Sequence, residues 1–172
     1  MYQKIKKNKI LSFQKKSLKI RKNIIDLLYN AQSGHAGPSL SIVELLVYLY
    51  FFNGNIKKNF FKLILSKGHA VPAWYATLIE KNILPRRDIF NLRKLGSKLQ
   101  GHPDKNFMKE VDCSTGALGQ GLSVAIGYAI ANKLKKKNSK VFCILGDGEL
   151  QEGQIWEAAM YIGAKKMKNL IT

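Results

Sequence analysis

Residues 140–172 narrow the choice of fold more than any other part of the chain. They contain the apolar run "KVFCIL", then the segment "EGQIWEAAMYIG", which has the composition of a helix, and then a second apolar run, "NLIT". Short continuous apolar runs are typical of strands that are buried on both faces, as in parallel sheets. Strand, helix and strand in this order predict a βαβ unit, and its crossover is expected to be right-handed.

The middle of the chain continues the same alternation. The run "FKLILS" (61–66) predicts another short buried strand, and a helix is expected from about Ala70 onward. Further helices are expected in "RRDIFNLRKL", which Gly96 ends, and in "GLSVAIGYAIANKL". Strands that alternate with helices predict an α/β fold, namely an open parallel sheet with helices on both faces.

Two helices are expected before the first strand. The segment "LKIRKNIIDLLYNA" carries an apolar face at helical spacing and is expected to end near Gly34; the face consists of Ile20, Ile24, Leu27, Leu28 and Ala31. The segment "SIVELLVYLYFF" opens with Ser41 and Glu44 three residues apart. This spacing predicts a capping box at the start of a buried helix.

Composition limits the class of protein. The 172 residues suit one domain with a hydrophobic core, which we expect to span 1–172 with a basic N-terminal extension at 1–14. No apolar run reaches the length of a membrane span, and no signal peptide is recognisable. Cys113 and Cys143 lack metal spacing, and we expect Cys143 to be a buried apolar side chain. We therefore expect a reducing compartment, the cytoplasm, without disulfides.

The formal net charge of +18 permits a second interpretation, a basic protein that binds RNA or a membrane. Only four of the 29 basic residues are arginines, and the lysines are spread along the chain. Arginine is the side chain that most often contacts bases, and no nucleic-acid-binding motif accompanies the charge. We therefore favour lysines on solvated faces and expect neither nucleic acid nor a membrane as a partner.

Two glycine-containing turns follow or precede apolar segments. In "ILGDGEL", Asp147 between Gly146 and Gly148 offers a carboxylate at the end of a strand, which suits Mg²⁺ shared with phosphate oxygens. In "STGALGQGLS" (114–123), glycines precede a helix whose free N–H groups can bind an anion. For the first turn alone, an ordinary strand-to-helix turn with an Asp near the helix start is the favoured interpretation. In the second turn, some of the glycines are expected to serve helix packing. The glycine spacing of the second turn differs from the dinucleotide fingerprint, which argues against an NAD site.

All three histidines follow a glycine and fall in predicted loops: His35, His69 and His102. A single loop histidine is usually only a solvated side chain. Three such pairs in a histidine-poor chain suggest a shared role in binding phosphate, holding sugar hydroxyls or moving protons near neutral pH.

Taken together, these motifs resemble a known family. The segments "SGHAGPSLS", "LSKGHAVPAWY", "LRKLGSKLQGHPD", "STGALGQGLS" and "GDGELQEGQIWEAA" are similar, in this order, to the thiamine diphosphate domain of transketolase. The likeness is greatest to the separately encoded N-terminal subunit of split transketolases. It runs from about residue 15 to the end of the chain, and the five motifs together make it specific.

The resemblance implies a role for each matching position. Asp147 would coordinate Mg²⁺ (or Ca²⁺), and Gly148 and His69 would contact the diphosphate of the cofactor. Gly116, Ala117 and Leu118 would lie near its aminopyrimidine. The residues implied in catalysis are His35 and His102, which would face the sugar, and Glu152, which would link two active sites across a subunit interface.

The resemblance also implies the reaction and the partners. A two-carbon ketol unit would pass from a ketose phosphate to an aldose phosphate, as in the pentose phosphate pathway, with the cofactor supplying the carbanion. The partners would be a second copy of the chain and a C-terminal subunit that carries the pyrimidine-activating glutamate. The Asn that completes the family's metal motif would fall beyond Thr172, so we interpret the sequence as a domain cut short at its C-terminus. An inactive remnant without ligand remains a third hypothesis.

Overall fold

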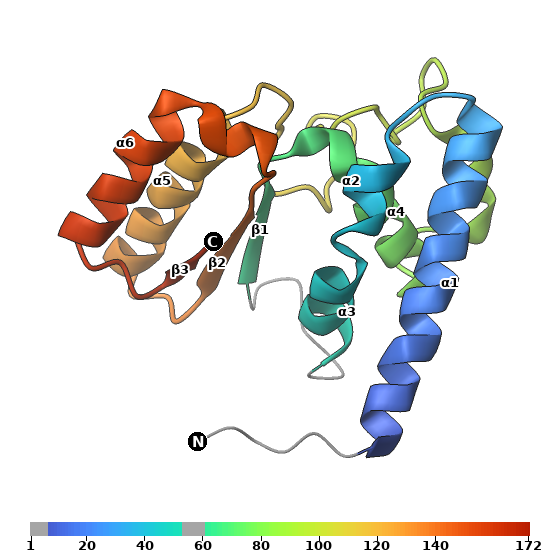
Figure 1. The fold of residues 1–172 in the computed structure, drawn as a ribbon, viewed down its shortest axis with the longest axis horizontal. Coiled ribbons are helices and arrows are strands. Elements are labelled where there is room, and N and C mark those ends of the chain that lie inside the picture. Colours follow the sequence, from blue (N-terminus) through green and yellow to red (C-terminus); the bar gives the residue numbers. More distant parts are fainter. Residues whose placement is uncertain (1–6, 53–60) are drawn as a thin grey trace. The chain divides into compact units, whose positions relative to one another are not determined.

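The computed structural model describes residues 7–52 and 61–172, and within it the chain forms two compact units. The first unit comprises Met1–Ile56 and Pro72–Gly101, and the second comprises Lys57–Val71 and His102–Thr172. Figure 1 labels the elements of both. The described part of the first unit is helical: α1 (Lys7–Ala31), α2 (Ala36–Leu40), α3 (Val43–Phe51), α4 (Val71–Glu80, whose first residue belongs to the second unit) and the 3₁₀ helix η2 (Arg86–Asn91).

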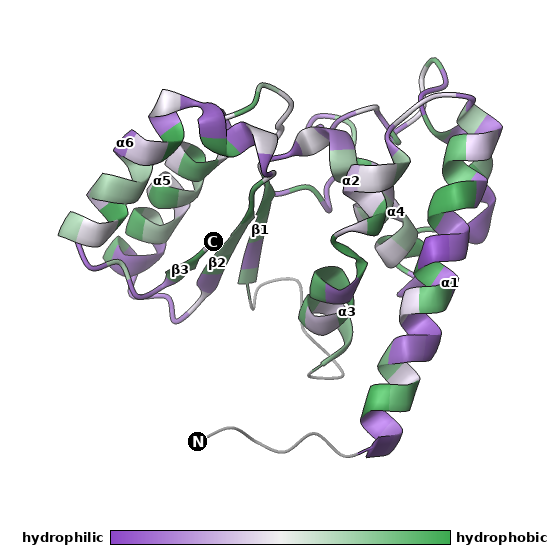
Figure 2. Cartoon of the chain, in the orientation of Figure 1, coloured by the Kyte–Doolittle hydropathy of each residue, from purple (hydrophilic) through white to green (hydrophobic). Residues whose placement is uncertain are grey.

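Helix α1 carries the apolar face that its spacing predicts. Three of the five expected residues, Ile20, Ile24 and Leu27, are fully buried, while Leu28 and Ala31 are partly buried. Apolar and polar residues alternate along the helix in Figure 2. The helix ends three residues before Gly34, and its first turns lie within the basic segment 1–14. At Gly34 the backbone has a φ of 125°, a conformation that glycine adopts without strain.

The predicted capping box at the start of α3 is wrong. The residue before the helix is Ile42, whose side chain makes no capping hydrogen bond. The Ser41 hydroxyl instead donates to the carbonyl of Pro38 at 2.9 Å, because Ser41 follows α2 directly and serves that helix's C-terminus. The Glu44 carboxylate accepts two hydrogen bonds from Arg21 on α1, at 2.7 and 2.9 Å. The capping pattern is therefore used for a contact between α1 and α3.

The second unit contains the expected parallel sheet. Its strands are β1 (Phe61–Leu65), β2 (Lys140–Ile144) and β3 (Leu170–Ile171), hydrogen-bonded in the order β1-β2-β3 with both pairs parallel. The helices are α5 (Gln120–Leu134) and α6 (Gly153–Ala164), with the 3₁₀ helices η1 (Gly68–Ala70) and η3 (Gly148–Gln151). Strand β2, helix α6 and strand β3 form the predicted βαβ unit, and the α/β fold class is confirmed.

The core of the second unit lies between the sheet and α5. Helix α5 packs against all three strands and α6 packs against α5, as Figure 1 shows. Alanines on α5 allow this close approach, because their small side chains leave room for the helix to pack closely against the sheet. The buried cluster includes Ile64, Leu122, Ala125, Ala129, Val141, Cys143, Ile155 and Leu170. The expected burial of Cys143 is confirmed.

No helix in the described ranges 7–52 and 61–172 is long and apolar enough to cross a membrane.

Candidate functional site

The site begins where β1 and β2 end. The backbone N–H groups of Ser66 and Lys67 both donate to the carbonyl of Ile144, at 2.9 and 3.4 Å. The parallel pairing of β1 and β2 therefore continues past the last strand residues. The turn after β1 and the turn after β2 leave the sheet together, at the carboxyl edge where open α/β sheets bind ligands.

A third turn, at residues 114–119, is fastened to the first. The Thr115 hydroxyl donates to the carbonyl of Leu65 at 2.6 Å. Gly68 passes so close to Thr115 that an added Cβ would stand 3.0 Å from the Thr115 carbonyl carbon. Any larger residue at position 68 would push these two turns apart, since real Cβ atoms rarely approach backbone atoms so closely.

The predicted histidine His102 lies against this third turn. The N–H of Thr115 donates to the carbonyl of Pro103 at 3.1 Å, which holds the segment that carries His102. A Cβ added at Gly116 would lie 3.4 Å from Cγ of the His102 ring. The exposed His102 imidazole and Gly116 are therefore neighbours, although they are far apart in the sequence.

The other predicted site residues of the second unit lie on or beside these turns. Asp147 is exposed and immediately precedes η3, and Gly148 begins η3. His69 is partly buried in η1, Ala117 and Leu118 are exposed on the third turn, and Glu152 is exposed at the start of α6. His35 is exposed at the start of α2 in the first unit. A hollow of about 350 Å³ follows the third turn, lined by Ser114, Thr115, Gly116, Ala117, Gln120, Gly121 and Val124.

Sequence reasoning missed the residue that connects these turns, Glu149. Its side chain is only 1% exposed. One carboxylate oxygen accepts a short hydrogen bond from the Ser66 hydroxyl and another from the Gly119 N–H at 2.8 Å. The second oxygen accepts from the Gly146 N–H at 3.1 Å. A single buried carboxylate therefore joins the turn after β1, the turn before α5 and the turn after β2.

Lys67 was also missed, and it supplies a positive charge among these carboxylates. The residue is 8% exposed. Burial lowers the pKa of the Lys67 ammonium, while the negative charges of Asp147 and Glu149 act in the opposite direction. The signal, a lysine buried next to two acids, is visible only in the folded chain. In the sequence, lysines are too frequent for Lys67 to stand out.

The two cysteines of the unit are not activated for chemistry. Burial raises the pKa of the Cys143 thiol to about 12, with a smaller contribution from the charge of Glu149. Burial likewise raises the pKa of Cys113. Both cysteines are free thiols, as expected from their spacing. Neither has the lowered pKa that a nucleophilic cysteine requires.

The donor set fits a cation shared with a phosphate group rather than a metal held by protein alone. Within residues 7–52 and 61–172, no group of three or more His, Cys, Asp and Glu side chains could hold a metal ion. The Glu149 oxygens are occupied by protein donors, whereas the Asp147 carboxylate is exposed. Beside it, Gly148 is open, since an added Cβ would meet nothing within 4 Å. The residues present therefore suit a diphosphate and its magnesium ion.

Comparison with known proteins agrees with this geometry. Residues 13–172 match the family described as "Transketolase, thiamine diphosphate binding domain". The chain belongs to this family.

Curated relatives include both whole and split transketolases. The chain is 40% identical over 158 residues to the 6-deoxy-6-sulfo-D-fructose transketolase subunit SqwG of Clostridium sp. (strain MSTE9), a match that covers 88% of the chain and 58% of that subunit. It is 37% identical over 177 residues to the transketolase of Pongo abelii, covering 99% of the chain and 28% of that protein. The chain thus spans little more than half of the split subunit and just over a quarter of the whole enzyme.

Solved structures give the same fold. The transketolase of Campylobacter jejuni superposes with a TM-score of 0.82 at 31% identity, over 92% of the chain and 27% of that protein. The transketolase of Leishmania mexicana superposes with a TM-score of 0.84 at 26% identity, over 92% and 26% respectively. The predicted resemblance is confirmed, and the alternative of a basic binding protein is not favoured.

Proposed function

We propose that the chain is the N-terminal, cofactor-binding component of a transketolase that transfers a two-carbon ketol unit between a ketose phosphate and an aldose phosphate. The observation that carries this proposal is the meeting of three turns, 66–69, 114–119 and 146–149, at one edge of the parallel sheet. These turns carry parts of three of the family's five motifs, all within the second unit, and the Glu149 hydrogen bonds join them.

Three residues face the diphosphate end of the proposed cofactor. Asp147 binds Mg²⁺ (or Ca²⁺) through its exposed carboxylate, and the diphosphate oxygens supply further ligands. Gly148 contacts the diphosphate through its backbone, with no side chain to block the approach. His69, on the neighbouring 3₁₀ helix, binds the same end of the cofactor.

The third turn faces the ring end of the cofactor. Gly116, Ala117 and Leu118 contact the aminopyrimidine, beside the hollow at the start of α5. The exposed His102 imidazole next to Gly116 holds a sugar hydroxyl and accepts or returns its proton. The bound cofactor supplies the carbanion chemistry, and the chain positions the sugar and moves protons.

The proposed assembly contains two kinds of chain. A C-terminal subunit supplies the pyrimidine-activating glutamate, and a second copy of this chain meets the first near Glu152, which is exposed at the start of α6. The split subunits among the relatives support a separate partner. The free thiols fit a reducing compartment, and we propose the cytoplasm.

Calorimetric titration with thiamine diphosphate tests the proposal. It is run with and without Mg²⁺, and with and without a matching C-terminal subunit. We expect binding that depends on Mg²⁺ and on Asp147, and ketol transfer only when the partner subunit is present. Asp147→Asn should lower cofactor affinity at least tenfold, because a neutral amide is a weaker ligand for Mg²⁺. Absence of binding in every combination would refute the proposed function.

A further inference from the structure

The backbone of Lys67 is held on both sides. Its N–H donates to Ile144 at the end of β2, and its carbonyl accepts from the Ala70 N–H at 2.9 Å. The first bond ties it to the sheet and the second to the 3₁₀ helix that carries His69. Lys67 therefore starts from a fixed position at the carboxyl edge of the sheet.

The side chain of Lys67 runs along Gly146. A Cβ added at Gly146 would stand 3.3 Å from Cβ and 3.5 Å from Cδ of Lys67. The absence of a side chain at position 146 thus leaves room for the lysine stem directly before Asp147. Asp147 and Glu149 are the two charged groups that act on the Lys67 ammonium. The ammonium consequently lies within electrostatic reach of both acids.

The balance of charges at the site gives the Lys67 ammonium a role beyond neutralising one acid. Glu149 already receives three hydrogen bonds from protein donors. A diphosphate would add two or more negative charges next to Asp147 and Glu149. A positive charge on a residue that is only 8% exposed weakens that repulsion, because charges interact more strongly where water is excluded.

We infer that Lys67 is an anion-binding residue of the cofactor site, an inference that rests on the proposed function. Lys67 supplies a fixed positive charge to the diphosphate beside the Asp147-bound metal. Glu149 acts as its positioning residue. The Glu149 carboxylate accepts hydrogen bonds from Ser66, the residue before the lysine, and from Gly146, along which the lysine side chain runs. The ligand class recognised by Lys67 is the diphosphate group, whatever the sugar substrate.

The competing explanation is that Lys67 merely neutralises the buried Glu149. The two explanations differ in what they predict for a graded set of ligands. A purely structural lysine would affect thiamine, thiamine monophosphate and thiamine diphosphate alike. A lysine that contacts the diphosphate would affect the three ligands in proportion to their phosphate charge.

Calorimetry of the 172-residue chain with its partner subunit at saturating Mg²⁺ distinguishes these two explanations for Lys67. We expect Lys67→Met to weaken thiamine diphosphate binding by about 10- to 100-fold, which is on the order of 1.4–2.8 kcal/mol. Thiamine monophosphate should lose less affinity, and thiamine should bind unchanged. Lys67→Arg should retain most of the diphosphate affinity, since it keeps the charge.

Lys62→Met is the matched control. Lys62 lies within β1, and its ammonium pairs with Asp112 at 2.6 Å. Its loss should leave the affinities for all three ligands unchanged. Thermal melts accompany each variant, and if Lys67→Met does not fold, Lys67→Gln is compared with Lys67→Arg instead.

Each result decides the matter. Equal affinity of wild type and Lys67→Met for thiamine diphosphate, or an equal loss for all three ligands, overturns the inference while the proposed function stands. A wild-type chain that binds no thiamine diphosphate overturns the proposed function and the inference with it. A loss graded by phosphate charge supports both.

Discussion

Gly121, in the first turn of α5, is required because Ser66 lies against it. A Cβ added at Gly121 would come within 2.7 Å of the Ser66 Cα, closer than real Cβ atoms approach a backbone. We predict that Gly121→Ala lowers the free energy of unfolding by about 1–3 kcal/mol through overpacking. Urea denaturation measures this.

Gly127 on the same helix is the matched control for that substitution. It is exposed, and an added Cβ would meet nothing within 4 Å. Gly127→Ala should therefore raise stability by about 0.5–1 kcal/mol, as alanine does in an open helix interior. If both substitutions had the same effect, the close contact between α5 and the turn after β1 would be contradicted.

The buried thiol of Cys143 gives a second prediction for a single residue. With its pKa raised to about 12, only about one thiol in 10,000 is ionised at pH 8. Because the thiolate is the reactive form, we predict that iodoacetamide alkylates Cys143 in the native chain far more slowly than in urea. Mass spectrometry of tryptic peptides reports the modified fraction. Rapid native labelling at Cys143 would contradict its burial in the core.

At the scale of elements, one exposed ion pair, between Arg21 and Glu44, joins α1 and α3. The hydrogen bonds from Arg21 lower the pKa of Glu44. The carboxylate form is thus favoured in the folded chain, and its stabilisation is present above the unfolded pKa. That stabilisation is lost as the pH falls through the lowered pKa. The side chains are 37% and 63% exposed, so solvent screens the pair.

A double-mutant cycle with Arg21→Met and Glu44→Gln measures this ion pair. We predict a coupling free energy of about 0.2–1 kcal/mol at pH 7 in low salt, decreasing in high salt. The coupling should vanish at a pH below the lowered pKa of Glu44, where the carboxyl is protonated. A coupling that stayed constant across pH would show that Glu44 serves α3 by another contact.

Elements were more predictable than their ends. The strands at 61–65 and 140–144 follow from short continuous apolar runs, and helix α5 follows from a longer apolar segment rich in small residues. The start of α3 was not predictable in this way. Ser41 and Glu44 have the spacing of a capping box, but tertiary contacts with α1 and the end of α2 use these side chains instead.

The candidate site was predictable only through its exposed residues. Asp147 and His102 stand out in the sequence because of their glycine neighbours and their chemistry. Glu149 and Lys67 stand out only when β1 and β2 are paired, since Ser66 and Glu149 are 83 residues apart in the chain and the acids near Lys67 are similarly distant. The role of a buried polar group is determined by the groups that form hydrogen bonds with it, and these can be distant in the sequence.

At the scale of the whole molecule, ligand binding should protect one unit selectively. A ligand that binds only the folded chain stabilises it by about 2.7 kcal/mol at one hundred times its dissociation constant. We predict that thiamine diphosphate with Mg²⁺ slows hydrogen exchange at the amides of 66–70, 115–121 and 146–151, which all belong to the second unit. Residues 7–19 of α1 should exchange at an unchanged rate, because no predicted cofactor contact lies there.

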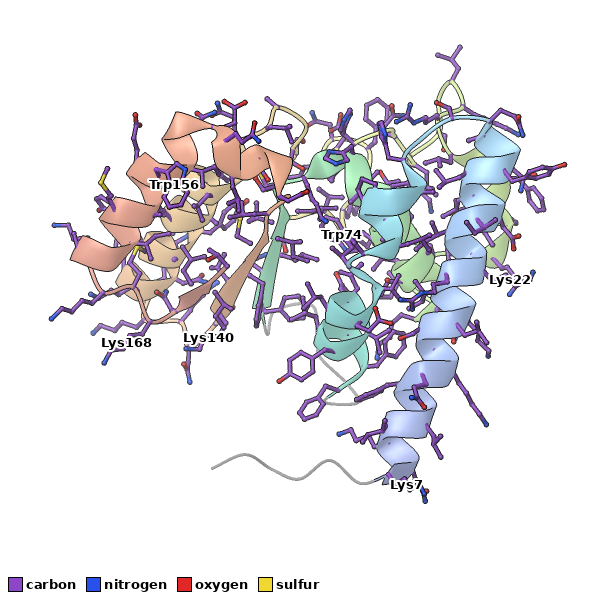
Figure 3. The ribbon with its side chains drawn as sticks, in the orientation of Figure 1. Lys7, Lys22, Trp74, Lys140, Trp156 and Lys168 are labelled. Atoms are coloured by element: carbon purple, nitrogen blue, oxygen red, sulfur yellow. The ribbon has the colours of Figure 1, made fainter. Side chains whose placement is uncertain are left out.

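Mass spectrometry of the exchanged chain resolves these segments. Asp147→Asn at the same ligand concentration serves as the control, since it should remove the protection without altering exchange in the absence of ligand. Protection confined to the lysine-rich segments 133–137 and 165–168, the second of which contains Lys168 labelled in Figure 3, would instead indicate that the diphosphate binds as a general anion. The three turns would then not be the cofactor site.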